Sequence, residues 1–386
     1  MISYSFKFLK ISCGLKGLAC VAVGSLLIVL GGCSSTPDKP KPTALADFKT
    51  QLNITKTWSV QLSPVYPPLA ANLASNRLAV VTANGLISVM DASSGTEVWR
   101  AALNTPVGAG IGGDGDRYAV ISQANELISL SEGKLMWRVK LPALSFTAPL
   151  VAGGRVFVLS ADRTVMAFDG ASGQKLWSQQ RTGDPLVLKQ AGILTSFQDN
   201  LLVGLSGRLV AMNPANGIAK WEVTIGSSRG TNEVERLVDL VAGVSRVNNM
   251  ICARAFQTSV TCVDALRGAN LWTRAAQGHT GLGGSESMLV GSESDGKLMS
   301  WNRTNGQVAW QSEALRFRGP TSAIVSEAQL VVGDDLGWVH WLDQKNGQTL
   351  ARVQADASGI AMAPLPIGKS WVIVTKNGLV QAYRAE

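Results

Sequence analysis

Short apolar runs, each about as long as a β-strand, recur along the chain from Trp58 to the C-terminus. Each repeat contains an apolar strand, a turn, a second strand that ends in a turn led by Asp or Asn, and then usually a tryptophan. Successive repeats start roughly 40 residues apart, a spacing typical of four-stranded β-propeller blades. The pattern therefore predicts an all-β chain and excludes a helical solenoid.

The turns of the repeat share a polar first residue, a glycine, and a tryptophan three or four residues later. Asp or Asn at the head of a turn can accept hydrogen bonds from backbone N–H groups two residues on, and glycine supplies the positive φ that reverses the chain. The tryptophan begins the next strand, where its ring can pack between neighbouring sheets. The turns with their tryptophans are Asp91–Gly95 with Trp99, Ser131–Gly133 with Trp137, Asp169–Gly173 with Trp177, Asn213–Gly217 with Trp221, Asp264–Gly268 with Trp272, Asn302–Gly306 with Trp310, and Asp343–Gly347, where Ala351 replaces the tryptophan.

The strand count predicts how such a ring closes. Seven repeats run from one tryptophan strand to the next, and an eighth pair of strands, Ser370–Thr375 and Gly378–Tyr383, ends the chain without an outer strand. The strand Lys56–Leu62 precedes the first full repeat and can complete that last blade, which covers exposed sheet edges. We therefore expect an eight-bladed β-propeller with four antiparallel strands per blade over residues 53–386.

The first 32 residues have the features of an export signal. Lysines at positions 7, 10 and 16 precede an apolar run, Gly17–Gly31, that is too short for a lasting membrane span. The run ends in Leu-Gly-Gly-Cys33, which resembles the lipobox of bacterial lipoproteins. The resemblance implies that residues 1–32 are removed and that Cys33 carries the acyl chains, palmitate among them, that anchor the protein. The alternative is a secreted protein with a chance cysteine.

The residues after the cysteine are expected to form a tether. Ser34 resembles the residue found there in lipoproteins that are sent on to the outer membrane. Ser34–Thr43 is polar and rich in proline, so it has nothing to bury and should be disordered. Ala44–Leu52 could add a short helical turn. We therefore assign residues 33–52 to a lipidated N-terminus and flexible tether.

Composition and charge agree with a large all-β domain. Hydrophobic residues make up 46% of the chain, and 40 glycines suit many tight turns. The net charge of +8 falls to +5 without residues 1–32, which contain three lysines and no acidic residue. No block of Lys and Arg interleaved with aromatic residues occurs, so we expect a solvated basic surface and no nucleic-acid site.

Few residues suit catalysis. His279 and His340 belong to no metal-binding spacing, and no nucleophile elbow, phosphate loop or Cys–His pair occurs. We therefore expect no catalytic residue, no metal site and no cofactor. Cys252 and Cys262 lie in the two strands of one predicted hairpin, where they could form a cross-strand disulfide or remain unbonded.

One class of enzymes shares the repeat. The segment Asp169–Trp177 resembles the tryptophan-docking motif of pyrroloquinoline-quinone dehydrogenases, which are also eight-bladed periplasmic propellers. Those enzymes carry adjacent cysteines beneath the cofactor, whereas this sequence has no Cys-Cys pair and is far shorter. A quinone-dependent periplasmic oxidoreductase is the alternative function, because one fold can host different activities.

Signal, lipobox, tether and eight blades together resemble the BamB family, the lipoproteins of the outer-membrane β-barrel assembly machinery. The segments Gln329–Leu342 and Asn377–Tyr383 look much like the last two blades of that family. The resemblance implies a non-enzymatic scaffold, lipid-anchored at the periplasmic face of the outer membrane. It also implies that the scaffold binds the periplasmic domains of the barrel protein BamA and other subunits of the machinery, and assists nascent outer-membrane proteins.

Two inserts lengthen the repeats between Trp177 and Trp272. They carry Asp184–Lys189 and Glu233–Asp239, in which apolar residues stand beside charges. Exposed apolar residues with a charged rim are typical of a protein-binding patch. The alternative is that the leucines of the first insert line an inner strand.

Both inserts also resemble the BamA-binding loops of the BamB family. The match implies a partner-binding set in which Lys189 replaces an arginine and so loses bidentate geometry. A second Asp of the family is replaced by Val241, and Asp239 is expected at the charged rim. The implied partner-binding residues are Leu186, Leu188, Lys189, Arg236 and Asp239.

Overall fold

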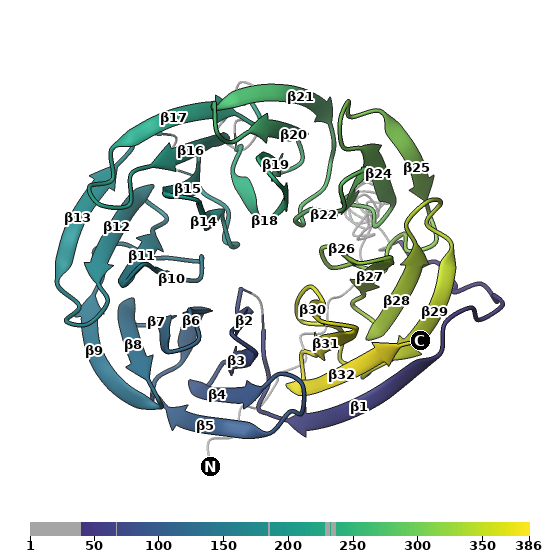
Figure 1. Ribbon diagram of the computed structural model, residues 1–386, viewed down its shortest axis with the longest axis horizontal. Helices are drawn as coiled ribbons and strands as arrows, with labels where there is room; N and C mark the ends of the chain where they lie inside the picture. The colour runs from purple at the N-terminus through teal and green to yellow at the C-terminus, as the bar shows by residue number, and fades with distance from the viewer. Residues whose placement is uncertain (1–39, 67, 184–185, 228–231, 233–236) are drawn as a thin grey trace, which may run out of the picture. The chain divides into compact units, whose positions relative to one another are not determined.

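Each predicted blade is a four-stranded antiparallel sheet, and eight such sheets follow one another around a ring (Figure 1). This computed structural model describes residues 40–66, 68–183, 186–227, 232 and 237–386, so the predicted signal peptide and Cys33 lie outside the described residues. Residues 42–386 form one unit. In the part of the chain that the structure describes, no helix is long and apolar enough to span a membrane.

The strands of the first four blades are β2 (Ala71–Ala74), β3 (Arg77–Val81), β4 (Leu86–Asp91) and β5 (Glu97–Ala102); β6 (Val107–Gly113), β7 (Arg117–Ser122), β8 (Glu126–Ser131) and β9 (Lys134–Lys140); β10 (Leu150–Ala152), β11 (Arg155–Leu159), β12 (Thr164–Asp169) and β13 (Lys175–Gln180); and β14 (Leu194–Phe197), β15 (Asn200–Leu205), β16 (Arg208–Met212) and β17 (Ala219–Thr224).

The strands of the last four blades are β18 (Leu240–Val247), β19 (Met250–Ala255), β20 (Ser259–Asp264) and β21 (Ala269–Ala275); β22 (Gly283–Gly284), β23 (Met288–Ser292), β24 (Leu298–Asn302) and β25 (Val308–Ser312); β26 (Ile324–Ser326), β27 (Gln329–Gly333), β28 (Trp338–Asp343) and β29 (Thr349–Gln354); and β30 (Leu365–Ile367), β31 (Ser370–Val374), β32 (Leu379–Ala385) and β1 (Ile54–Gln61).

The eighth blade is built from both ends of the chain. Its strand order is β1-β32-β31-β30, and Figure 1 shows β1 along the outer side of β32. Trp58 lies opposite Ala382, and Ile54 lies opposite Ala385. The first strand of the propeller therefore covers the edge of the last one, which would otherwise be open to pairing.

Burial follows the position of a strand within its blade. The two middle strands of the third blade, β11 and β12, are buried along almost their whole length because neighbouring blades cover both of their faces. The outer strand β13 instead exposes every residue except Trp177 and the half-buried Gln179. This difference explains why the middle strands are continuous apolar runs and the outer strands are polar.

Each outer-strand tryptophan contacts the glycine turn of the next blade. The indole N–H of Trp137 donates to the carbonyl of Gly170, 2.8 Å away, in the turn that ends at Gly173. Gly173 has a φ of +75°, and a Cβ there would lie 2.6 Å from the Trp137 ring. The same contact pairs Trp58 with Gly95, Trp99 with Gly133, Trp177 with Gly217, Trp221 with Gly268, Trp272 with Gly306 and Trp310 with Gly347. The turn thus needs glycine for its φ and for the room that the ring occupies.

The Asp or Asn at the head of a turn acts as the sequence predicts, whereas Ser131 in the second blade donates to Asp116 O instead. In the third blade, Asp169 Oδ1 accepts hydrogen bonds from the N–H groups of Ala171, at 3.1 Å, and Ser172, at 2.8 Å. Hydrogen bonds from Ser172 hold the pKa of Asp169 below its usual value. The carboxylate therefore fixes the turn onto which the tryptophan docks.

Ala351 stands where the tryptophan is missing, and the topology gives the reason. A tryptophan on β29 would dock onto the turn between the third and fourth strands of the eighth blade. Those strands are β32 and β1, which are opposite ends of the chain and share no turn. The N-terminal segment takes this place instead, since Leu52 packs in the same apolar cluster as Ala351.

The predicted tether ends earlier than expected, because residues 43–53 lie against the sixth to eighth blades. Thr43 N–H donates to Arg316 O at 3.0 Å, and the Arg352 guanidinium lies 5.0 Å from the centre of the Phe48 ring. Leu45 packs beside a core cluster of the ring. No helical turn forms over residues 44–52. Leu45, Phe48 and Leu52 give this part apolar surface to bury, which the polar stretch before Thr43 lacks.

A buried charged cluster holds the start of that segment. Arg318 Nε lies 2.7 Å from Asp334 Oδ2, which also lies 3.2 Å from His340 Nε2, and all three side chains are buried. Arg318 Nη1 donates to Thr43 O at 2.9 Å. Burial would raise the pKa of Asp334, but hydrogen bonds from His340, Trp338 and Arg318 hold it below its usual value. Burial lowers the pKa of His340, despite the opposing effect of Asp334.

We expect Gly173→Ala to destabilise the protein more than Gly153→Ala. Both glycines lie in the third blade with positive φ, but a Cβ at Gly153 would meet nothing within 4 Å. Gly153→Ala should therefore cost only the left-handed strain, about 1 kcal/mol, whereas Gly173→Ala should cost about 1–3 kcal/mol more through the clash with Trp137. Urea unfolding measures both. Equal losses would show that tryptophan docking does not constrain the turn.

We expect His340 to make stability depend on pH. Its pKa is lowered in the folded protein. Below the unfolded-state pKa of about 6.5, the unfolded chain therefore binds a proton that the folded protein does not, and the free energy of unfolding decreases as the pH is lowered. His340→Gln should reduce the slope of unfolding free energy between about pH 6.5 and 5.5 by up to about 1.4 kcal/mol per pH unit. Both proteins should carry His279→Gln, which removes the only other histidine. An unchanged slope would contradict the assignment.

Candidate partner-binding site

The two inserts that the sequence singles out lie side by side in the structure. One is the connection from β13 to β14, and the other is the connection from β17 to β18. The N–H of Leu188 donates to Asp239 Oδ2 at 2.8 Å, although the two residues are 51 positions apart. The structure thus brings Leu186, Leu188, Lys189 and Asp239 together, while Arg236 lies outside the described residues.

The two leucines have different environments. Leu186 is 38% exposed, and its carbonyl accepts a hydrogen bond from Arg163 Nη2 at 3.0 Å. Leu188 is half-buried and lines a small cavity of about 50 Å³. Both residues precede β14, so the alternative that they line an inner strand is wrong. Leu186 is available to a partner, and Leu188 secures the loop that presents it.

Asp239 joins the two inserts through a hydrogen bond. Its side chain is half-buried, and burial raises its pKa. The hydrogen bond from Leu188 and the positive charge of Arg163 act in the opposite direction and favour the carboxylate. The structure adds a role within the site, the bond to Leu188, while the place of Asp239 at the charged rim of a partner contact stays a prediction.

Arg163 is a site residue that the sequence pattern did not indicate. It lies in the turn between β11 and β12 with a φ of +63°, and it is buried. Besides its bond to Leu186, its positive charge acts on Asp239. The sequence shows only an arginine in a turn where the repeat requires no particular side chain. This signal is too weak to predict a role.

Lys189 supplies the positive charge of the site. Its side chain is exposed, and it makes no ion pair with any residue that the structure describes. The position of the missing second acidic residue, Val241, is buried in β18. The charged part of this surface therefore depends on Lys189 among the described residues.

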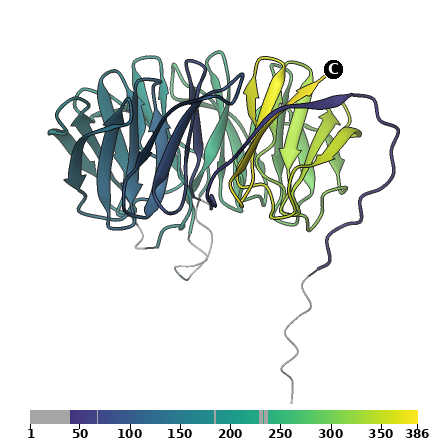
Figure 2. The same cartoon turned by 90° about the horizontal axis from the view of Figure 1, so that it is seen from below.

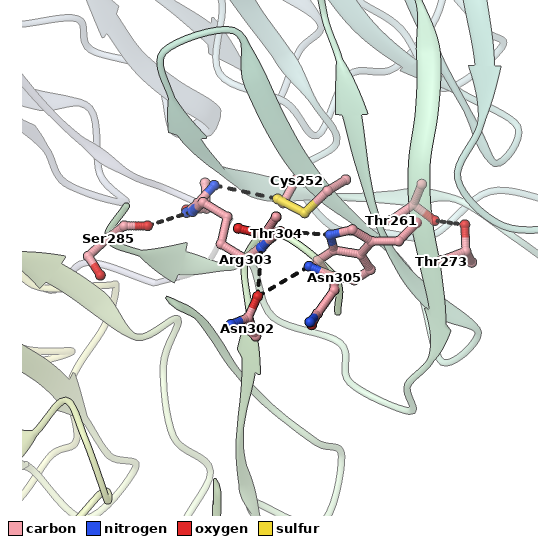
Figure 3. The surroundings of a disulfide bond; sticks show 11 residues. Cys252, Thr261, Thr273, Ser285, Asn302, Arg303, Thr304 and Asn305 are labelled. Atoms are coloured by element: carbon pink, nitrogen blue, oxygen red, sulfur yellow. Dashed lines mark hydrogen bonds between the residues drawn. A yellow bond between two sulfur atoms is a disulfide. The ribbon is translucent and has the colours of Figure 1, made fainter. Parts of the chain in front are cut away.

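The cysteines lie in the fifth blade and are joined by a disulfide (Figure 3). Cys252 and Cys262 are cross-strand partners on β19 and β20, with Cα atoms 4.0 Å apart and no exposed surface. The Arg303 guanidinium of the next blade lies 3.5 Å from Cys252 Sγ, and burial lowers the pKa of Arg303 to about 10. Trp272 donates to the Arg303 carbonyl at 2.7 Å, so the disulfide lies beneath a docked turn and supports the fold.

No group of three or more His, Cys, Asp or Glu side chains in the described part of the chain is arranged to hold a metal ion. The acidic residues of the repeat instead bond to backbone N–H groups of their own turns, as Asp169 and Asp264 do. These carboxylates therefore have a structural role.

Comparison with known proteins agrees with this architecture. A family model described as outer membrane protein assembly factor BamB matches residues 83–312. A BamB protein of Burkholderia pseudomallei is 30% identical over 94% of this chain and 97% of its own length. The crystal structure of BamB from Moraxella catarrhalis superposes with a TM-score of 0.78 at 21% identity, covering 86% of this chain and all of that one.

The dehydrogenases with the same repeat are also structural neighbours. Quinohemoprotein alcohol dehydrogenase from Comamonas testosteroni superposes with a TM-score of 0.65 over 86% of this chain and 76% of its own, but at 12% identity. Such a likeness shows the fold alone. The match of the family model over more than half of the sequence, together with the whole-length relative, shows that this chain belongs to the BamB family of outer membrane protein assembly factors.

Proposed function

We propose that this chain is a non-enzymatic scaffold of the outer-membrane β-barrel assembly machinery. It binds the periplasmic domains of BamA and assists the folding and insertion of nascent outer-membrane proteins. A lipid on Cys33 holds it at the periplasmic face of the outer membrane. Family membership supports the process, and the loop pair around Leu186 supports the binding role.

The observation that carries the proposal is an exposed leucine on a rigidly supported loop. Arg163 holds the carbonyl of Leu186, and Asp239 holds the N–H of Leu188 two residues later. The backbone is therefore fixed at two points while the Leu186 side chain remains 38% exposed. Pre-ordering of a contact residue lowers the entropy lost on binding, and a leucine that becomes buried contributes favourable desolvation.

The charge beside the leucine favours an acidic partner surface. Lys189 lies next to the loop as an exposed cation, and cations of this kind speed and orient association. Lysine makes a point contact where arginine would form two parallel hydrogen bonds. The apolar contact at Leu186 therefore contributes more to affinity here than the charged contact does.

The alternative of a quinone-dependent oxidoreductase rests on the fold alone. The dehydrogenase neighbours are 12–13% identical to this chain, whereas the BamB relative is 30% identical over nearly its whole length. No contact in the structure favours the enzyme over the scaffold.

We expect Leu186→Asp to weaken binding to the purified periplasmic domains of BamA by at least about tenfold, because a leucine contact is lost and a carboxylate is desolvated. Ile218→Asp is the matched control, since Ile218 is 61% exposed in a turn on the other face of the ring. Surface plasmon resonance measures both affinities, and circular dichroism checks the fold. Equal affinities of the two variants would place the interface elsewhere.

We expect Cys33→Ser to abolish lipid attachment, because the diacylglyceryl group is joined to the cysteine sulfur by a thioether that serine cannot form. Metabolic labelling with a fatty-acid probe reports the modification, and fractionation reports the release of the protein from the outer membrane. Cys13→Ser is the control, since it changes a cysteine of the predicted signal peptide but keeps the lipobox and the disulfide. Label retained on the Cys33 variant would rule out the anchor.

A further inference from the structure

A groove of about 550 Å³ lies beside Lys189, on the face of the ring that carries the connections between blades. Every such connection runs from the outer strand of one blade to the inner strand of the next, so all of them lie on one face, opposite the glycine turns (Figure 2). The residues that define the groove are Tyr66, Leu69, Val107, Leu144, Phe146 and Lys189.

The groove has an apolar floor and exposed apolar walls. Leu69 and Val107 are buried at its base, while Tyr66 is 51% exposed and Leu144 is 56% exposed. Large apolar side chains that are left in water next to one another mark a surface that another molecule covers. Leu186, 38% exposed, lies in the same connection between blades as Lys189.

The groove and the Leu186 loop form one continuous surface. Phe146 lines both the groove and the small cavity beneath Leu188. The connection that carries Leu144 and Phe146 is tied to the first insert, since Gly192 N–H donates to Thr147 Oγ1 at 2.9 Å. One partner surface that covers the loop of Leu186 can therefore also contact the groove.

Two polar features indicate which chemical groups of a partner the groove favours. Lys189 is the only Lys, Arg, Asp or Glu among the described residues that line it, and these residues therefore give the groove one positive charge. Asn125 also lines the groove, and its Oδ1 is buried without a hydrogen-bond donor from the described residues. A buried acceptor of this kind is costly unless a partner N–H donates to it.

We infer that this groove is the second half of the BamA-binding surface, and that it takes an apolar or aromatic side chain that the partner presents beside a carboxylate. The side chain fills the space between Tyr66 and Leu144, the carboxylate pairs with Lys189, and a partner backbone N–H donates to Asn125. The inference rests on the proposed function, since it names a further part of the same interface.

The test compares two pairs of exposed apolar residues in the full-length lipidated protein in detergent. Tyr66→Ser with Leu144→Ser should weaken binding to the purified periplasmic domains of BamA by at least about tenfold, because central apolar contacts carry most of the affinity of an interface. Ile218→Ser with Leu266→Ser removes two apolar side chains that are 61% and 51% exposed in turns on the opposite face, and should leave the affinity unchanged. Lys189→Gln should weaken binding most at low ionic strength.

The outcomes separate this inference from the proposed function. Wild-type affinity for the Tyr66 and Leu144 double variant, with Leu186→Asp still weakened, overturns the groove and leaves the scaffold role intact. Wild-type affinity for both variants, or no binding by the wild-type chain, removes the proposed function itself.

A photo-crosslinking amino acid in place of Leu144 identifies the occupant even if the double variant fails to fold. Crosslinks to the BamA domains support the groove as described. Crosslinks to a second copy of this chain, or to lipid alone, overturn it.

Discussion

The contact of a tryptophan ring with a glycine in the next blade is the constraint from which the rest of the ring follows. In six of the seven turns the ring lies within 2.7 Å of where a Cβ would be, and in all seven the glycine has a left-handed φ, so the turn favours glycine. Five of the seven tryptophans also donate an indole hydrogen bond to a turn carbonyl, which fixes the rotation of one blade against the next. Burial of a side chain of this size stabilises the interface by on the order of 2 kcal/mol per blade.

The glycine turns that meet this constraint lie on one face of the ring. The connections on the opposite face are therefore free to vary in length and sequence. The glycine turns lie together on one face, and their spacing has to match the tryptophans. The connections between blades carry no such requirement, so they can lengthen, as the two inserts around Leu188 and Asp239 do. Binding residues on loops above a rigid scaffold are a common division of labour.

The repeat made the fold predictable, and the absence of a repeat made the site harder to predict. Blade number, strand order and the docking tryptophans follow from residues that recur in register, because each recurrence tests the previous one. The role of Asp239 depends on a bond to Leu188 across 51 residues, and that of Arg163 depends on its burial beneath the same loop. Thr43 contacts Arg316 and Arg318 from a segment that has no regular secondary structure and no repeated sequence, so no sequence pattern predicts this contact.

The strand order of the eighth blade determines at what point in synthesis the ring can close. Its outer strand β1 comes before the other strands of the propeller in sequence and its neighbour β32 comes after them, with Thr57 Oγ1 donating to Ala382 O across 325 residues. The ring cannot close until both strands have been made, because long-range strand pairing waits for both partners. A chain that ends before β32 leaves β1 without the strand with which it pairs. The pairing of β1 with β32 thus separates chains that contain both strands from chains truncated before β32, by their ability to close the ring.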